Sequence, residues 1–316
     1  MRRKIDGDRV YYHLMSRTVG GRALLGVRCR EVLRKMIWQV AEFSGVRVVT
    51  YAIMKNHFHV LVEVPGGVDV SDSEIVRRFR RLYPKPTPWQ PLSPRQVKKL
   101  LSVNGQEGQE LRRKLLSRMH DVSWLMRTIK QRFTRWYNQT EESFGTVWAE
   151  RFKSVLVEGS PFALRTVAAY IDLNAVRAGL VEDPKDYRFC GYGEAMGGGR
   201  SARAGLRIAD PKLSGYRQTL YGAGSGEKSG KISISREDAV RVLEIERGKL
   251  PLPVVLRCRV RYFSEGIAIG SPQFVELCRN AEHGVHPKNK PKVHPMEGAD
   301  WDGLSVGAGL RTNLFG

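Results

Sequence analysis

The strongest constraint on the fold is the order in which two kinds of periodicity follow one another early in the chain. The stretch "DRVYYHLMSR" alternates and is rich in strand-forming residues, which predicts a first strand. "REVLRKMIWQVAEFSG" repeats apolar residues at helical spacing and stops at Gly45, which predicts a helix. "VRVVTYAIM" and "HFHVLVEV" then predict two strands joined by a short, hairpin-like connection at Lys55 and Asn56.

The next segments continue this alternation of strands and helices. "VSWLMRTIKQRFTRWYNQ" predicts an amphipathic helix, and "GTVWAERFKSVLVEG" predicts a turn followed by a strand. "PFALRTVAAYIDLNAVRAG" predicts a helix with Ser160 as its N-cap and Gly179 past its end. The order β-α-β-β-α-β-α predicts an α+β chain with a ferredoxin-like split βαβ antiparallel sheet, helices on one face and the last helix as an addition.

Composition along the chain predicts four parts. Residues 1–195 carry the pattern above, interrupted by a proline-rich and basic insertion at about 66–121. Glycine and serine accumulate in residues 196–234, which predicts a linker. Residues 235–282 predict a small helical extension, with a turn-helix cadence compatible with DNA binding. Residues 283–316 are rich in Pro, Gly and Lys and predict a loosely ordered tail.

The charge of the chain predicts a polyanionic partner. Lys and Arg total 53 against 32 for Asp and Glu, a formal net charge of +21. Such an excess favours nucleic acid, and a solvated basic surface is the alternative. We find neither an apolar stretch of membrane length nor a signal-peptide core, so we expect no membrane partner and a cytoplasmic, nucleoid-associated protein. The four cysteines show no CxxC spacing, which argues against a zinc ribbon or a disulfide framework.

Two of the seven histidines, His57 and His59, flank Phe58 in the third predicted strand. Side chains alternate across a strand, so both imidazoles point to one face, about 7 Å apart at the backbone, while Phe58 points to the other. Two imidazoles so placed can converge on one divalent metal ion. The alternative is that each histidine forms an ordinary hydrogen bond on a half-exposed sheet face.

The last predicted helix supplies further candidates for chemistry. Tyr170 and Asn174 are four residues apart and share a helix face. Asn174 offers a carbonyl oxygen suited to Mg²⁺ or Mn²⁺, and Tyr170 offers a phenol that can attack a metal-polarised phosphate. Arg177 follows on the same helix and can contact a phosphate. From the residues alone, three other tyrosines compete with Tyr170: Tyr137, Tyr187 and Tyr192.

Several of these segments together resemble a known family. "MKNHFHVLVEVP" resembles the His-hydrophobic-His motif of HUH endonucleases. "AAYIDLNAVRAGLVEDPKDYRFCGY" resembles the tyrosine helix of the single-tyrosine HUH transposases, specifically the REP-associated tyrosine transposases. "YYHLMSR", "RTIKQRFTRWYNQ" and "GTVWAERFKSVLVEG" resemble the segments before and between these motifs, so the resemblance covers most of residues 1–195. The chain departs from the family at Ala175, where proline is usual.

This resemblance implies an activity and its residues. It implies that His57, His59 and Asn174 hold a divalent metal ion, Mg²⁺ or Mn²⁺, and that Tyr170 is the catalytic nucleophile. The enzyme would be a transposase-type endonuclease that cuts single-stranded, hairpin or REP-like DNA. A 5′-phosphotyrosine intermediate would keep the energy of the phosphodiester for strand transfer. The sequence leaves open whether the protein is a monomer or a homodimer.

Basic residues near these motifs are candidates for DNA contacts. The alternative for each is an ordinary solvated cation. They are Arg127, Lys130, Arg132, Arg135, Arg151, Lys153 and Arg177.

Two other functions stay open. One is a non-catalytic nucleic-acid-binding protein on the same scaffold. The other is a different HUH enzyme, a replication initiator or a relaxase, although these often carry a second tyrosine or a third histidine in the motif.

Overall fold

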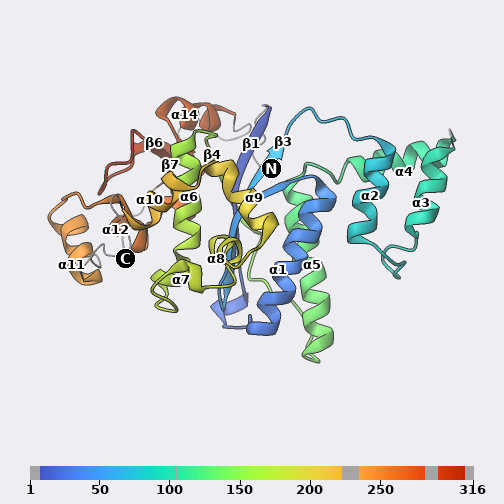
Figure 1. The fold of residues 1–316 in the computed structure, drawn as a ribbon, viewed down its shortest axis with the longest axis horizontal. Coiled ribbons are helices and arrows are strands. Elements are labelled where there is room, and N and C mark those ends of the chain that lie inside the picture. The colour runs from blue at the N-terminus through green and yellow to red at the C-terminus, as the bar shows by residue number, and fades with distance from the viewer. Residues whose placement is uncertain (1–7, 104, 223–234, 282–290, 310–316) are drawn as a thin grey trace.

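The computed structural model describes residues 8–103, 105–222, 235–281 and 291–309 (Figure 1). The fold is built on a seven-stranded sheet in the order β2-β3-β1-β4-β5-β7-β6. None of the described helices is long and apolar enough to cross a membrane.

The first four strands form the predicted ferredoxin-like sheet. Neighbouring strands are antiparallel in three pairs: β2 with β3, β3 with β1, and β1 with β4. The strands β1 and β2, which the first helix connects, therefore run parallel to each other. This is the split βαβ arrangement, so the predicted fold class is confirmed. The bounds are β1 (Arg9–Arg17), β2 (Arg47–Ile53), β3 (His57–Pro65) and β4 (Lys153–Val157).

Helices cover both faces of this sheet, whereas the sequence predicted one. The helices α1 (Val27–Ser44) and α5 (Val122–Thr140) pack together, and the ring of Phe58 on β3 meets this layer through Trp148, 5.4 Å away between ring centroids. On the other face, α6 (Pro161–Asp172) packs on β2 and β3. That face carries buried polar groups, such as the fully buried Glu63. Buried polar groups need hydrogen-bond partners.

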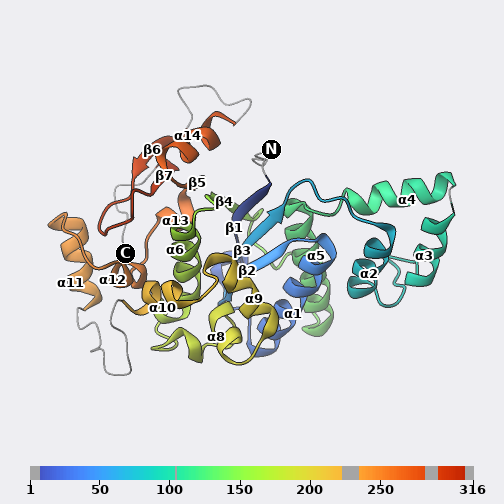
Figure 2. The same cartoon turned by 45° about the horizontal axis from the view of Figure 1, so that its top comes forward.

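The basic insertion forms three helices that project to one side of the molecule (Figures 1 and 2). Serine side chains cap two of them, and Pro94 occupies the first turn of the second. The helices are α2 (Asp72–Leu82), α3 (Pro94–Ser102) and α4 (Gln106–Leu116).

The predicted linker at 196–234 is wrong for residues 200–221, which form helices packed on the domain; residues 223–234 lie outside the described residues. Gly205 explains part of the difference. A Cβ there would lie 2.2 Å from the carbonyl oxygen of Val48, so glycine lets the helix approach the strand closely. The segment after α7 (Asn174–Arg177) contains α8 (Gly191–Met196), α9 (Arg200–Ala209) and α10 (Ser214–Tyr221).

The C-terminal part extends the sheet instead of standing as a separate helical unit with a loose tail. Strand β5 (Ala268–Gly270) pairs in parallel with β4, and β7 (Ser305–Ala308) pairs with β5 and with β6 (Lys292–Pro295). These strands satisfy the edge of β4, which would otherwise expose unpaired backbone groups. They are too short for periodicity to reveal. Residues 282–290 and 310–316 of the expected tail lie outside the described residues.

The helices that accompany these strands are short. A π-helical turn at Arg241–Ile245 follows the first of them. They are α11 (Arg236–Val240), α12 (Leu252–Arg257), α13 (Tyr262–Glu265) and α14 (Pro272–Asn280).

Candidate active site

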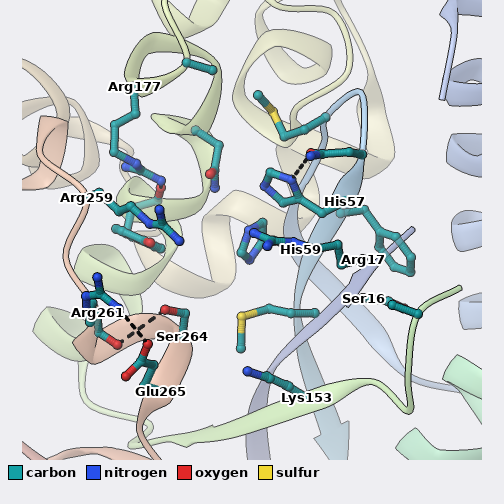
Figure 3. Close-up of a pocket in the computed structure, with 18 of the residues that line it drawn as sticks. Ser16, Arg17, His57, His59, Lys153, Arg177, Arg259, Arg261, Ser264 and Glu265 are labelled. Atoms are coloured by element: carbon teal, nitrogen blue, oxygen red, sulfur yellow. Dashed lines mark hydrogen bonds and ion pairs between the residues drawn. The ribbon is translucent and has the colours of Figure 1, made fainter. Parts of the chain in front are cut away.

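A pocket of about 510 Å³ lies where β1 ends and β3 begins (Figure 3). Its walls come from these strands, from the segment that leads into β4, from the junction of α6 and α7, and from the segment around α13. The structure thus brings together residues that are far apart in the sequence. All four residues predicted to carry the chemistry line it: His57, His59, Tyr170 and Asn174.

The orientation of His57 is set by Asn56. The Nδ1 atom of His57 lies 2.7 Å from Oδ1 of Asn56, the dashed line at His57 in Figure 3. The Asn56 amide is itself oriented, because its Nδ2 donates to the carbonyl oxygen of Gly21 at 3.0 Å. Oδ1 therefore accepts, and Nδ1 of His57 carries the proton. This leaves Nε2 of His57 with a lone pair for a metal ion.

The orientation of His59 is set by His13, a residue that the sequence analysis did not identify. Nε2 of His13 lies 2.8 Å from Nδ1 of His59, and the two rings stack with centroids 5.0 Å apart. Both imidazoles are buried. When Nδ1 of His59 donates to His13, Nε2 of His59 is free to bind a metal ion, as it is in His57.

The surroundings keep all three imidazoles neutral. Burial, together with the positive charges of Arg17, Arg177 and Arg259, lowers the pKa of His57 to about 4, against an opposing contact with the side chain of Asn174. Burial lowers the pKa of His13 to about 3 and that of His59 well below its ordinary value. Neutral imidazole is the form that binds a metal ion.

The side chain of Asn174 lies at the start of α7, where the tyrosine helix is interrupted at Leu173. Its Nδ2 donates to the carbonyl oxygen of Ile171 at 3.1 Å, which leaves Oδ1 as the group available to a cation. Two imidazole nitrogens and one amide oxygen are donors that suit a divalent ion such as Mn²⁺ or Mg²⁺. The residues therefore fit the expected metal, although no three His, Cys, Asp or Glu side chains form a metal-binding group in the part of the chain that the structure describes.

The ring of Tyr170 is held between two other side chains. Phe263 stacks on one face with ring centroids 4.1 Å apart and an interplanar angle of 18°. The guanidinium of Arg177 lies 3.9 Å from the centroid and also donates to the backbone oxygen of Tyr170 at 2.6 Å. The side chain is only 4% exposed, yet it lines the pocket.

The competing tyrosines are separated by position. Tyr170 lines the pocket, whereas Tyr137, Tyr187 and Tyr192 do not. The hydroxyl of Tyr187 donates to the backbone oxygen of Ile53 at 2.7 Å. Of these four tyrosines, Tyr170 is therefore the one that lies in the pocket with His57 and His59.

The seven basic residues predicted to contact DNA divide into two groups. Arg151, Lys153 and Arg177 line the pocket. The other four, on α5, do not, and three of them lie over aromatic rings. Their pairs are Lys130 with Trp148, Arg132 with Tyr83 and Arg135 with Trp89, while Arg127 is exposed.

Some residues that line the pocket, or that contact its lining residues, were not predicted from the sequence. His13 could have been found, because the split βαβ order places β1 beside β3, and His13 shares a strand face with Met15, which pairs with His59. Arg259, Arg261 and Phe263 carried no such signal, since they come from the C-terminal part, beyond the segments that carry the resemblance.

Comparison with known proteins identifies a similar family for the first part of the chain. Residues 7–83 match the family model described as IS200-like transposases, which confirms the predicted resemblance for the segment that contains His57 and His59. Tyr170 lies outside the matched range. No curated protein matches the chain.

Among solved structures, one of the REP-associated tyrosine transposase bound to a REP hairpin is similar to this chain. It is 16% identical, with a TM-score of 0.41, and the match covers 74% of this chain and 98% of that one.

Proposed function

We propose that this protein is a transposase-type enzyme that cuts and rejoins single-stranded or hairpin DNA through a covalent bond to Tyr170. The observation that carries the proposal is the convergence of His57, His59, Asn174 and Tyr170 on one basic pocket. The match of residues 7–83 to IS200-like transposases supports it, and the net charge of +21 supports a nucleic-acid substrate.

The chemistry assigned to the residues is a transfer of one phosphodiester. The phenol oxygen of Tyr170 bonds to the scissile phosphorus, and the bond from phosphorus to the 3′ oxygen breaks. The phenol proton is released, and the departing 3′ oxygen takes up a proton to become a hydroxyl. Attack by another 3′-hydroxyl on the phosphotyrosine reverses these steps and joins the strands.

The residues around Tyr170 prepare this step. His57, His59 and Asn174 would hold Mg²⁺ or Mn²⁺, which when bound supplies Lewis-acid polarisation of the phosphate. Asn56 fixes the tautomer of His57, and His13 orients His59. Phe263 and Arg177 restrict the orientation of the Tyr170 ring, which favours attack from one direction.

The test is the formation of a covalent adduct. The protein is incubated with Mn²⁺ and an end-labelled single-stranded hairpin taken from beside its own gene, and the products are separated under denaturing conditions. We expect a labelled protein band that is lost in Tyr170→Phe and kept in Tyr137→Phe, a matched change on α5 outside the pocket. A band that survives Tyr170→Phe would show that the nucleophile is another residue.

The non-catalytic alternative has one observation in its favour, which is the low exposure of Tyr170. It predicts that the wild-type protein binds the hairpin yet forms no adduct with any flanking strand, with Mn²⁺ or with Mg²⁺.

A further inference from the structure

The basic side chains of the pocket are not equivalent, because some are engaged by other groups of the chain. Six basic side chains line the pocket, against the two carboxylates Glu150 and Glu265. Two of the six are engaged: Arg261 pairs with Glu265 at 3.2 Å, and Arg177 donates to two backbone oxygens. The others are Arg17, Arg151, Lys153 and Arg259.

Arg17 and Arg259 reach the pocket of the candidate metal ligands from two segments that are far apart in the sequence. Arg17 ends β1 directly opposite His57 in the strand register. It shares the strand face of His13 and Met15, which turns its side chain toward the pocket. Figure 3 shows Arg259 and Arg17 reaching the pocket from opposite sides of the view. Both arginines line the pocket that also holds His57 and His59.

The backbone that carries Arg259 is fixed on both sides. Before it, the backbone oxygen of Leu256 accepts from Nη1 of Arg177 at 2.8 Å, which ties the end of α12 to α7. Beside it, Cys258 and Val260 are buried. After it, Phe263 stacks on Tyr170 and β5 joins β4. The exposed side chain of Arg259 therefore projects from a rigid support, and little conformational entropy of the backbone is lost when it binds.

We propose that Arg17 and Arg259 form a phosphate-binding pair that holds the phosphodiester backbone of a single DNA strand across the candidate metal site. The proposal deepens the function proposed above and assigns the C-terminal part of the chain a direct role in substrate binding. Guanidinium groups suit this task, because their planar donors match phosphate oxygens and they stay charged at all working pH values. Arg17 lies within the range matched by the family model, and Arg259 lies far outside it.

The experiment measures binding without chemistry. A fluorescein-labelled, single-stranded deoxythymidine oligonucleotide is titrated with the full chain carrying Tyr170→Phe, and anisotropy is recorded at several salt concentrations. We expect Arg259→Gln and Arg17→Gln each to weaken binding about tenfold, as expected for one charged hydrogen-bonded contact. Each change should also flatten the slope of log Kd against log salt by about 0.7, the value for one phosphate contact on a single strand.

Two further variants control the result. Arg259→Lys keeps the charge and should restore the salt slope while recovering only part of the affinity. Arg95→Gln removes an exposed cation from α3, away from the pocket, and should leave both quantities unchanged.

The outcomes separate this proposal from the proposed function. If Arg259→Gln kept the oligonucleotide affinity and the salt slope of the Tyr170→Phe chain, the proposed phosphate-binding pair would be overturned, whatever the adduct assay shows. A loss of affinity and slope, together with no adduct from the wild-type protein, would leave the pair standing on a non-catalytic binding protein.

Discussion

Replacing His13 tests how the candidate metal site is built. In His13→Leu, Nδ1 of His59 loses the fully buried partner that lies 2.8 Å away. An unpaired buried donor costs about 1–3 kcal/mol of folding free energy. The His59 ring is then free to rotate, and the loss of such an outer partner typically lowers metal affinity by about 10- to 100-fold.

The measurement is Mn²⁺ affinity, followed by titration calorimetry and by the electron paramagnetic resonance signal of free Mn²⁺. We expect His13→Leu to weaken Mn²⁺ binding within that range. His13→Gln should restore most of the affinity, because its Oε1 can accept from Nδ1 of His59. Ile37→Val, a buried change on α1 that costs about 0.5–1.5 kcal/mol, controls for general destabilisation.

The reasoning would be refuted if His13→Leu bound Mn²⁺ as tightly as Ile37→Val does. In that case the bond between His13 and His59 would be a packing feature without influence on the metal ligands.

Two other predictions follow from the same pocket. Phe263→Ala removes the ring stacked on Tyr170. We expect adduct formation, measured by single-turnover gels, to slow about tenfold with little change in oligonucleotide affinity. Faster adduct formation would mean that Phe263 shields the tyrosine instead. Acidification from pH 7 to pH 5 should lower the free energy of unfolding, measured by urea titration with circular dichroism. In the folded state the pKa of His13 is lowered to about 3 and that of His57 to about 4. Below pH 6.5 the unfolded chain therefore binds more protons than the folded chain does, which lowers the free energy of unfolding by up to about 2 kcal/mol for each group. Asp172 acts in the opposite direction, because burial raises its folded-state pKa to about 6. Its contribution to the free energy of unfolding is therefore more favourable at pH 5 than at pH 7, by about 1 kcal/mol. A free energy of unfolding that stays constant or rises at pH 5 would contradict this balance.

The sequence was most informative where regular periodicity meets a fixed topology. Alternation in the three early strands, with a helix after the first, leaves the split βαβ sheet as the natural arrangement. The same alternation puts His57 and His59 on one strand face, and helical spacing puts Asn174 one turn after Tyr170. In the structure, all four residues line one pocket.

Where local composition was the only guide, the predictions of a linker and of a separate C-terminal unit were wrong. Residues 200–221 belong to the stretch that was predicted as a linker from its glycine and serine content, yet they contain α9 and α10. Gly205 permits the close packing of α9 on β2. The strands β5, β6 and β7 have three or four residues each, and they exist because β4 offers an unpaired edge. Such elements are fixed by contacts distant in the sequence.

The sequence by itself therefore determined the ferredoxin-like core, the basic character of the protein and the candidate set His57, His59, Tyr170 and Asn174. The tertiary structure alone decided what surrounds that set: His13 behind His59, Phe263 against Tyr170, and Arg259 at the edge of the pocket. The physical reason is that periodicity encodes which face of an element is buried, whereas the partner on that face depends on how distant segments pack.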